Sequence, residues 1–419
     1  MGGFPVKHVF WGSFVESRRA FQTVLIIFLL IPCSLTEDYR AGPLMPNESL
    51  IWVWNVPTEA CIGNFSHSID LSLFPLIGSP RKTATGQPVT LFYVDRLGFY
   101  PHIDTKQVDH HGGIPQLGNL QDHLTKAKTD IEHYIPVDKL GLAIIDWEEW
   151  RPTWLRNWRP KDIYRNKSID LVKTNNAGIS ITDATKKAKE EFEAAGRKFM
   201  EETLKLGKSV RPKHLWGYYL FPDCYNNKFQ DPKYDGKCPP VEKQRNDDLN
   251  WMWKESTGLY PSVYLKKDLG SNRQAALYVR YRVVESVRVS KVRKEKDPVP
   301  IFVYIRLVFT DSTSEYLKEV DLVNTIGEIV ALGPAGIIIW DAMSLAQRAC
   351  KETSDMYYVG DVNVCTGGNV CIKAEIDTNP ASYLLPGKSL LFLIALTQIL
   401  HHMTEDIFVF LEKILVGAP

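Results

Sequence analysis

Three carboxylates and three tryptophans lie within twelve residues of the chain, in the run AIIDWEEWRPTW at 143–154. A carboxylate among aromatic side chains is costly to bury unless it is solvated, paired or used for chemistry. On a strand, residues two apart project to the same face, so Asp146 and Glu148 should point together while Glu149 points away. The pattern indicates either a carboxylate pair held for acid–base chemistry or a strand-end turn whose acids cap the next helix.

The spacing of Asp146 and Glu148 predicts which reaction such a pair would perform. Two neighbouring carboxylates cannot both ionise freely, and enclosure by Trp147, Trp150 and Trp154 would add desolvation, so we expect one raised pKa. A carboxyl group that stays protonated near neutral pH is what a glycosidase needs to protonate a leaving oxygen. We expect the pair to lie closer than the roughly 5–5.5 Å of retaining or the roughly 6.5–9.5 Å of inverting enzymes. This favours a substrate-assisted reaction, in which the acetamido oxygen of the sugar is the nucleophile.

The elements that would position these groups are apolar runs that alternate with amphipathic segments. Continuous apolar runs predict strands that are covered on both faces, as in a parallel sheet, at 49–57, 89–98, 140–150, 214–221, 258–265, 300–309 and 335–341. Residues 182–208 and 277–292 have the apolar spacing of helices. This alternation predicts an α/β fold, a distorted (β/α) barrel of the TIM type with seven to eight strands.

Polar and aromatic residues follow several of these runs. Asp95 and Arg96, Asp146 to Glu148, Asp223 and Asp341 each come directly after an apolar stretch. In a (β/α) barrel the C-terminal ends of the strands form the active-site face, so we expect these side chains to meet around one mouth.

Charge and the N-terminal segment limit the partners and the compartment. The 50 basic and 49 acidic side chains nearly cancel, which gives no general case for binding nucleic acid or an anionic membrane. Arg18 and Arg19 precede the apolar run 24–32, which predicts a signal peptide over 1–35, with an uncleaved anchor as the alternative. Three N-x-S sequons agree with secretion and predict glycosylation at Asn47, Asn64 and Asn166.

The cysteines indicate disulfides rather than a metal site. Six of them follow the predicted signal peptide, and an even number in a secreted chain favours disulfides. Cys224 and Cys238 are close enough to close a short loop. No CxxC pair occurs, and the adjacent histidines at 110–111 and 401–402 would diverge on a strand, so we expect no metal and no cofactor.

Longer motifs resemble those of the animal hyaluronidases, a family of glycoside hydrolases, with the closest similarity to its members on the mammalian sperm surface. The resemblance runs almost continuously from about residue 36 to residue 350. The motifs that carry it are DWEEWRPTWLRNW (146–158), FYVDRLGFYP (92–101), GGIPQ (112–116), LWGYYLFPDCYN (215–226), RNDDLNWMW (245–253) and ALGPAGIIIW (331–340).

The resemblance implies an endo-β-N-acetylglucosaminidase that cleaves the β-1,4 linkages of hyaluronan with retention. Glu148 would be the general acid/base, Asp146 would orient the acetamido nitrogen, and Tyr219 would place the acetamido group. The implied substrate-binding residues are Tyr93, Tyr219, Tyr260, Tyr304, Asp311 and Trp340. The implied disulfides join Cys61 to Cys350 and Cys224 to Cys238.

The chain departs from the family pattern after Trp340, since only fourteen residues separate Cys350 from Cys365. We therefore expect a barrel domain at 36–350, a remnant of a growth-factor-like cysteine module at 351–385 and a divergent hydrophobic tail at 386–419. The leading interpretation is an active hyaluronidase of the secretory pathway, which is secreted, acrosomal or on the cell surface and serves fertilisation. The alternatives are a catalytically weak adhesion protein that binds hyaluronan or a gamete partner, and a relative that prefers chondroitin.

Overall fold

The structure is a computed structural model that describes residues 41–46, 48–65, 69, 71–348 and 350–351, with the backbone of 364–366 and 370–372. The predicted signal peptide, the predicted hydrophobic tail, Asn47 and most of the predicted module remnant lie outside the described residues. Among the helices that are described, none is long and apolar enough to cross a membrane.

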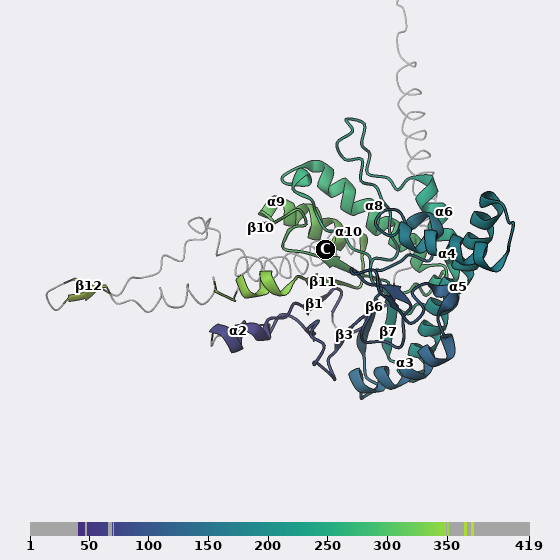
Figure 1. Cartoon of the computed structure of the whole chain (residues 1–419). Helices are drawn as coiled ribbons and strands as arrows, with labels where there is room; N and C mark the ends of the chain where they lie inside the picture. The colour runs from purple at the N-terminus through teal and green to yellow at the C-terminus, as the bar shows by residue number, and fades with distance from the viewer. Residues whose placement is uncertain are drawn as a thin grey trace, which may run out of the picture. The chain divides into compact units, whose positions relative to one another are not determined.

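Parallel strands form a barrel in which each strand follows its predecessor in the chain. The strands are β1 (Ile51–Asn55), β2 (Leu76–Ile77), β3 (Val89–Tyr93), β6 (Gly141–Asp146), β7 (His214–Tyr218), β8 (Phe302–Ile305) and β11 (Gly336–Trp340). They pair in two parallel sheets, of order β2–β1–β11–β8 and β3–β6–β7. Figure 1 shows the labelled strands β1, β3, β6, β7 and β11 grouped together, with helices on their outer sides.

Two further contacts join the sheets into a closed barrel. Residues 259–262 form isolated parallel bridges to Tyr219 on one side and to Ile301 and Tyr304 on the other, so this segment takes the place of a strand. At the opposite seam, a Cβ atom on Gly78 would lie only 2.4 Å from the carbonyl oxygen of Val89, so the backbones after β2 and at the start of β3 touch. The predicted (β/α) barrel is confirmed, and 259–262 with the seven strands gives it eight positions.

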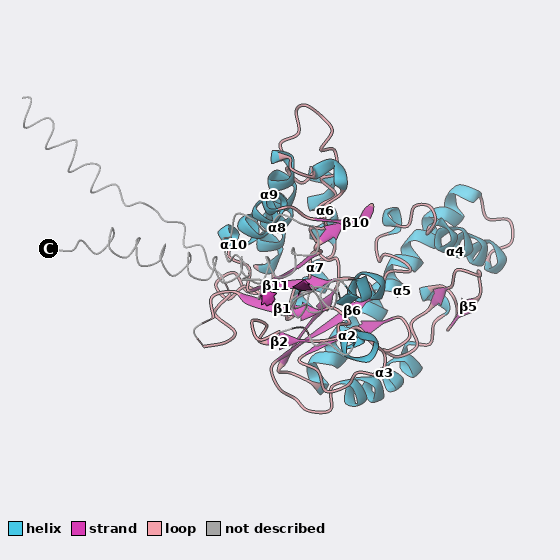
Figure 2. Cartoon of the chain, turned by 90° about the vertical axis from the view of Figure 1, so that its left-hand side faces the viewer, coloured by secondary structure: helices cyan, strands magenta, loops and turns pink. Residues whose placement is uncertain are grey.

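Helices connect the strands and cover the barrel, as Figure 2 shows by colour. They are α2 (Glu59–Phe65), α3 (Leu120–Tyr134), α4 (Asp162–Asn175), α5 (Ile181–Val210), α6 (Pro240–Asp248), α7 (Asn250–Glu255), α8 (Arg273–Ser290), α9 (Glu319–Leu322) and α10 (Glu328–Leu332). Both predicted helices are present, as α5 and α8. Helix α5 begins where the Ser180 side chain accepts a hydrogen bond from the Asp183 N–H, and it packs against α3, α4 and β7.

Short antiparallel hairpins lie outside the barrel order. They are β4 (His102–Ile103) with β5 (Asp109–His110), β9 (Val308–Phe309) with β10 (Ser312–Tyr316), and β12 (Val364–Thr366) with β13 (Val370–Ile372). The last of these places Cys365 opposite Cys371 in the backbone register.

Side chains along the strands alternate between the barrel interior and the covering helices. The inward set forms one core cluster, which includes Ile51, Val53, Val89, Leu91, Leu142, Ile144, Phe302 and Ile338. The residues between them belong to a second cluster with the helices, as Trp54, Phe92 and Ile145 do. The same alternation brings Asn55, Tyr93, Asp146 and Trp340 to the inward side at the last position of their strands.

Both disulfides implied by the resemblance are present. Cys61 in α2 is bonded to Cys350, 289 positions later, which ties the chain after β1 to the chain after β11. Cys224 is bonded to Cys238 within the segment between β7 and α6. The first bond fixes neighbouring C-terminal strand ends of the barrel against each other.

Candidate active site

Asp146 lies at the mouth of the barrel, as the last residue of β6 and paired in register with Tyr93 of β3. Burial raises the pKa of its carboxyl group to about 8, and repulsion from Glu148 and Glu149 acts in the same direction. Its buried Oδ1 has no hydrogen-bond partner among the described residues. At neutral pH this group is therefore mostly protonated, and one of its oxygens is free to bind a ligand.

Glu148 lies beyond the end of the strand, in the loop that follows β6, and its side chain is 47% exposed. The predicted strand run reached residue 150, whereas β6 ends at Asp146, so the two acids do not share one regular strand face. Their charges nevertheless interact, since Glu148 contributes to the raised pKa of Asp146. The predicted pair is thus one buried carboxyl group and one accessible carboxylate.

Arg151 holds Glu148 in place, and the sequence patterns did not single it out. Its Nη2 lies 2.9 Å from Glu148 Oε2, and its Nη1 donates to the Glu148 carbonyl oxygen at 3.1 Å. Burial alone would lower the pKa of this arginine, but its interactions with Glu148, Tyr225 and Tyr100 together keep the pKa above its ordinary value. The sequence signal for this residue is an arginine three positions after Glu148 in DWEEWR, although its burial could not be read from the sequence.

Glu149 forms a hydrogen bond with the backbone of the loop. Its Oε2 accepts a hydrogen bond from the Glu148 N–H at 3.1 Å. Lys161 donates to the carbonyl oxygens of both Glu148 and Glu149. These bonds fix the backbone around Glu148, so Glu149 contributes to the shape of the loop.

Aromatic side chains from four neighbouring barrel positions surround Asp146. The charge of Asp146 acts on the pKa values of Tyr93, Tyr219, Tyr264 and Tyr304, all of which are raised, mainly by burial. Tyr219 meets Tyr304 edge to face, with ring centroids 5.0 Å apart. Tyr264 stacks on Trp340 at 6.4 Å. The structure therefore brings four of the expected residues together at the mouth, namely Tyr93, Tyr219, Tyr304 and Trp340.

Tyr260 is not at this mouth. It is fully buried, stacks on Phe302, and donates its hydroxyl to the carbonyl oxygen of Leu215 near the start of β7. Tyr264, four residues later, stacks on Trp340 at the mouth, where the other implied substrate-binding aromatic residues lie. Both tyrosines face inward, but only the later one is near the C-terminal end of its segment.

Asp311 lies on the hairpin between β9 and β10 and is exposed. Its Oδ1 accepts a hydrogen bond from the Lys267 N–H at 2.8 Å. No described contact brings it to the carboxylates or to the aromatic group around Asp146.

Two of the three predicted glycosylation sites, Asn64 and Asn166, are described, and both are exposed. Glycosylation at these residues stays a prediction.

The three tryptophans do not enclose the carboxylates as expected. Trp147, Trp150 and Trp154 are buried in the outer core cluster, where Trp150 and Trp154 meet Phe192 of α5 and Trp147 stacks on Tyr100. The reason is the alternation along β6, which sends Trp147 outward, and the loop that follows, which lays the other two against α5. The aromatic surroundings of Asp146 are the barrel tyrosines instead.

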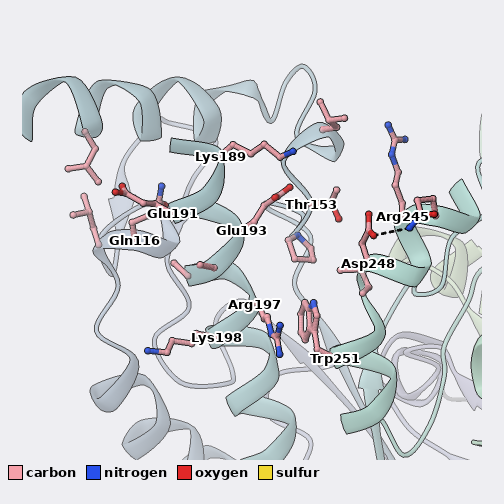
Figure 3. A pocket seen from close by; sticks show the side chains of 18 of the residues that line it. Gln116, Thr153, Lys189, Glu191, Glu193, Arg197, Lys198, Arg245, Asp248 and Trp251 are labelled. Carbon is pink, nitrogen blue, oxygen red and sulfur yellow. Dashed lines mark hydrogen bonds between the residues drawn. The ribbon is translucent and has the colours of Figure 1, made fainter. Parts of the chain in front are cut away.

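A cavity of about 1100 Å³ lies elsewhere, between α5 and the α6–α7 segment (Figure 3). Lys189, Arg197 and Lys198 line it together with Glu193 and Asp248, so its charges are mixed. Neither Asp146, nor Glu148, nor any of the aromatic residues around Asp146 lines it. The chemistry-bearing residues therefore assign the candidate active site to the barrel mouth.

The sequence is similar to those of known hyaluronidases. A sequence model described as hyaluronidase, a glycoside hydrolase family, matches residues 39–372. Hyaluronidase PH-20 of Mus musculus is 61% identical over an alignment that covers all of both chains. Hyaluronidase PH-20 of Homo sapiens is 57% identical over 92% of this chain and 79% of the human protein.

A solved structure is also similar. The crystal structure of bee venom hyaluronidase in complex with a hyaluronic acid tetramer has a TM-score of 0.61 and 29% identity, covering 74% of this chain and 96% of the bee protein. The mouse alignment extends over 513 positions whereas this chain has 419 residues, so the mouse protein has residues without a counterpart here.

Proposed function

The chain belongs to the hyaluronidase family of glycoside hydrolases, and we propose that it hydrolyses the β-1,4 linkages of hyaluronan with retention of configuration. One observation carries the proposal: a buried carboxyl group with a free oxygen, Asp146, lies beside an accessible carboxylate, Glu148, at the barrel mouth. Such a pair suits a reaction in which the substrate supplies its own nucleophile, because the buried member can hold an acetamido N–H while the accessible one handles protons.

In the first step, the acetamido oxygen of the sugar attacks its own C1, and the bond from C1 to the glycosidic oxygen breaks. Glu148 gives a proton to that oxygen, which leaves as a hydroxyl group. The positive charge that develops on the acetamido group as the C1–O bond breaks favours the ionised form of Asp146, so the single proton of the pair passes to Glu148 and from there to the leaving oxygen. Arg151, 2.9 Å from Glu148, then stabilises the carboxylate that remains.

In the second step, water attacks C1 from the face that the leaving group has vacated. Glu148 now accepts a proton from that water, and the ring of the intermediate opens to restore the acetamido group. Two displacements at C1 leave its configuration unchanged. Across both steps the glycosidic bond and one water molecule are consumed, and Asp146 and Glu148 return to their starting protonation.

The aromatic residues around Asp146 would hold the acetamido group and the sugar ring. Tyr219 and Tyr304 provide hydroxyl groups in a largely dry site, and Asn55 lies 3.5 Å from the Tyr304 hydroxyl. Trp340, stacked on Tyr264, offers an apolar wall for the sugar. Two disulfides support a place in the secretory pathway, and we propose that compartment for the protein.

The test measures product configuration and rate on a defined hyaluronan oligosaccharide. Proton NMR during the first turnovers should show the new reducing end in the β configuration. Glu148→Gln should lower kcat by about 10²–10⁴-fold, which is the usual contribution of general acid–base catalysis. Glu149→Gln is the matched control, since glutamine keeps the oxygen that accepts the Glu148 N–H, and its kcat should stay near that of the parent.

Three results would contradict the proposal. An α-configured product would exclude retention, and equal activity of the Glu148→Gln and Glu149→Gln variants would exclude Glu148 as the acid. Binding of hyaluronan without hydrolysis by the parent protein would favour the adhesion function instead. The same assay on chondroitin oligosaccharides separates the two substrate preferences.

A further inference from the structure

Trp158 is an exposed aromatic residue on the loop that carries the proposed acid. It is 43% exposed, whereas Trp147, Trp150 and Trp154 of the same stretch are buried. Tryptophan is enriched at binding interfaces, because its ring offers a large apolar face while its N–H can find a polar partner. Nothing in the proposed chemistry of Asp146 and Glu148 uses it.

The ring of Trp158 is fixed in place by two neighbours. Tyr225 meets it edge to face at 5.3 Å, with an interplanar angle of 89°. The Arg156 guanidinium lies 5.5 Å from its ring centroid and 3.6 Å from that of Tyr225. Arg156 is itself held by an ion pair with the buried Glu242. Little side-chain freedom is therefore left to lose when a ligand binds.

Trp158 belongs to the same face of the barrel as the acids. It lies between β6 and α4, and Tyr225 lies between β7 and α6, so both loops follow the C-terminal ends of neighbouring strands. The Trp158 carbonyl oxygen accepts the Lys161 N–H at 2.7 Å, and the Lys161 ammonium group donates to the Glu148 carbonyl oxygen. The tryptophan is thus linked through one residue to the backbone of the acid.

Glu148 lies between two groups of side chains. One group consists of Asp146 and the tyrosines whose pKa values are affected by its charge, and the acetamido sugar would bind there. Arg151 contacts Glu148 from the other group, and its charge acts on Tyr225, which contacts Trp158. The acid donates to the oxygen between two sugars, so the leaving chain extends from Glu148 away from the acetamido group.

We propose that Trp158 stacks against a sugar ring of the leaving chain, beyond the bond that is cleaved. This inference rests on the proposed retaining reaction. Lys161 supports it, because within the described part of the chain this lysine makes no ion pair, while hyaluronan carries a carboxylate on every second sugar. Trp158 and Lys161 together form a binding site for the uronate-containing product that departs first.

Transfer to an acceptor sugar tests this placement. In a retaining reaction, an added oligosaccharide that occupies the leaving-chain side attacks the intermediate in place of water. Trp158→Ala should lower the ratio of transfer to hydrolysis and kcat/KM on long hyaluronan up to about tenfold, the loss expected for one aromatic contact. Trp158→Phe should restore most of both. The matched control is Leu155→Ala, on the same loop and 54% exposed, which should change neither.

Thermal unfolding of each variant shows whether it has folded. If the alanine variant does not fold, Trp158→Phe keeps the test decisive. An unchanged transfer ratio in a folded Trp158→Ala protein would overturn the inference, as would an equal loss in Leu155→Ala. Absence of transfer products from the parent protein would count against retention itself. The site of cleavage in a reducing-end-labelled octasaccharide then decides the role of Trp158, because loss of a leaving-side contact shifts the cut and loss of retention does not.

Discussion

Replacing Asp146 with asparagine should stabilise the protein at pH 8 and leave its stability at pH 4 nearly unchanged. In the folded protein the pKa of Asp146 is raised to about 8, mainly by burial, whereas an unfolded aspartate has a pKa of about 3.9. Between these values the folded protein keeps a proton that the unfolded chain releases. A folded state that binds more protons loses stability as the pH rises, so the parent protein is weakened across this window.

The size of the effect follows from the same two values. The contribution of Asp146 to stability should fall by about 1.4 kcal/mol for each pH step between about 4 and 8, which amounts to about 5 kcal/mol at the upper end. Asparagine has nearly the same shape and carries no charge, so Asp146→Asn removes this dependence. The variant should therefore gain several kcal/mol over the parent at pH 8 while it loses hydrolytic activity.

Urea unfolding of parent and variant at pH 4, 6 and 8 measures the difference directly. Other titrating groups, such as His123, cancel in the difference because both proteins contain them. Asp297→Asn, at an exposed site near Lys294, is the matched control and should show no pH-dependent gain. A variant whose advantage is the same at every pH, or which is less stable at pH 8, would refute the burial of an unpaired carboxyl group at the barrel mouth.

Three further predictions concern other parts of the site and the core. Arg151→Met should lower kcat by about 10²-fold with a smaller change in KM, because Glu148 loses both its ion pair and the hydrogen bond to its carbonyl oxygen. Arg151→Lys should restore little of the lost kcat. An unchanged kcat in Arg151→Met would exclude this positioning role. Tyr264→Phe should lower kcat/KM. Tyr260→Phe should leave the kinetics unchanged and cost about 1 kcal/mol of stability, because the Tyr260 hydroxyl donates to a carbonyl oxygen in the core. The opposite pattern would favour Tyr260 as the residue at the mouth. Burial lowers the pKa of His123 to about 4, so relative to His123→Gln the parent protein should lose about 3 kcal/mol of stability between pH 6.5 and pH 4 in urea unfolding. The same pH dependence in both proteins would contradict this prediction.

The barrel was predictable because its strands are continuous apolar runs. Each of the seven runs corresponds to a strand or, for 258–265, to the bridged segment 259–262. Strand β2 was not predicted, because only Leu76 and Ile77 pair and two residues leave no periodic signal. The run 140–150 was predicted too long because strand length depends on partners: β6 pairs with β3 only up to Tyr93 and with β7 only up to Tyr218.

The site was predictable only as far as strand alternation reaches. Alternation correctly sent Asp146 inward, but it could not separate Tyr260 from Tyr264, because residues four apart face the same way. The rule that the mouth lies at the C-terminal strand ends favours the later tyrosine, and the structure places Tyr264 there. Arg151 and Trp158 lie in an irregular loop, where contacts depend on backbone angles that no periodic pattern encodes.

The position of each acid explains why three carboxylates in four residues behave differently. Asp146 is the last inward position of β6, so the same alternation that buries Leu142 and Ile144 also buries its carboxyl group and raises its pKa. Glu148, two residues later, is already outside the strand and meets Arg151, while the Glu149 carboxylate binds a backbone N–H. If β6 were one residue longer, Trp147 would pair regularly with the neighbouring strands, and the loop that carries Glu148 would leave the sheet in a different direction. The acid–base pair therefore depends on where β6 ends, and moving that end should abolish activity even with both acids retained.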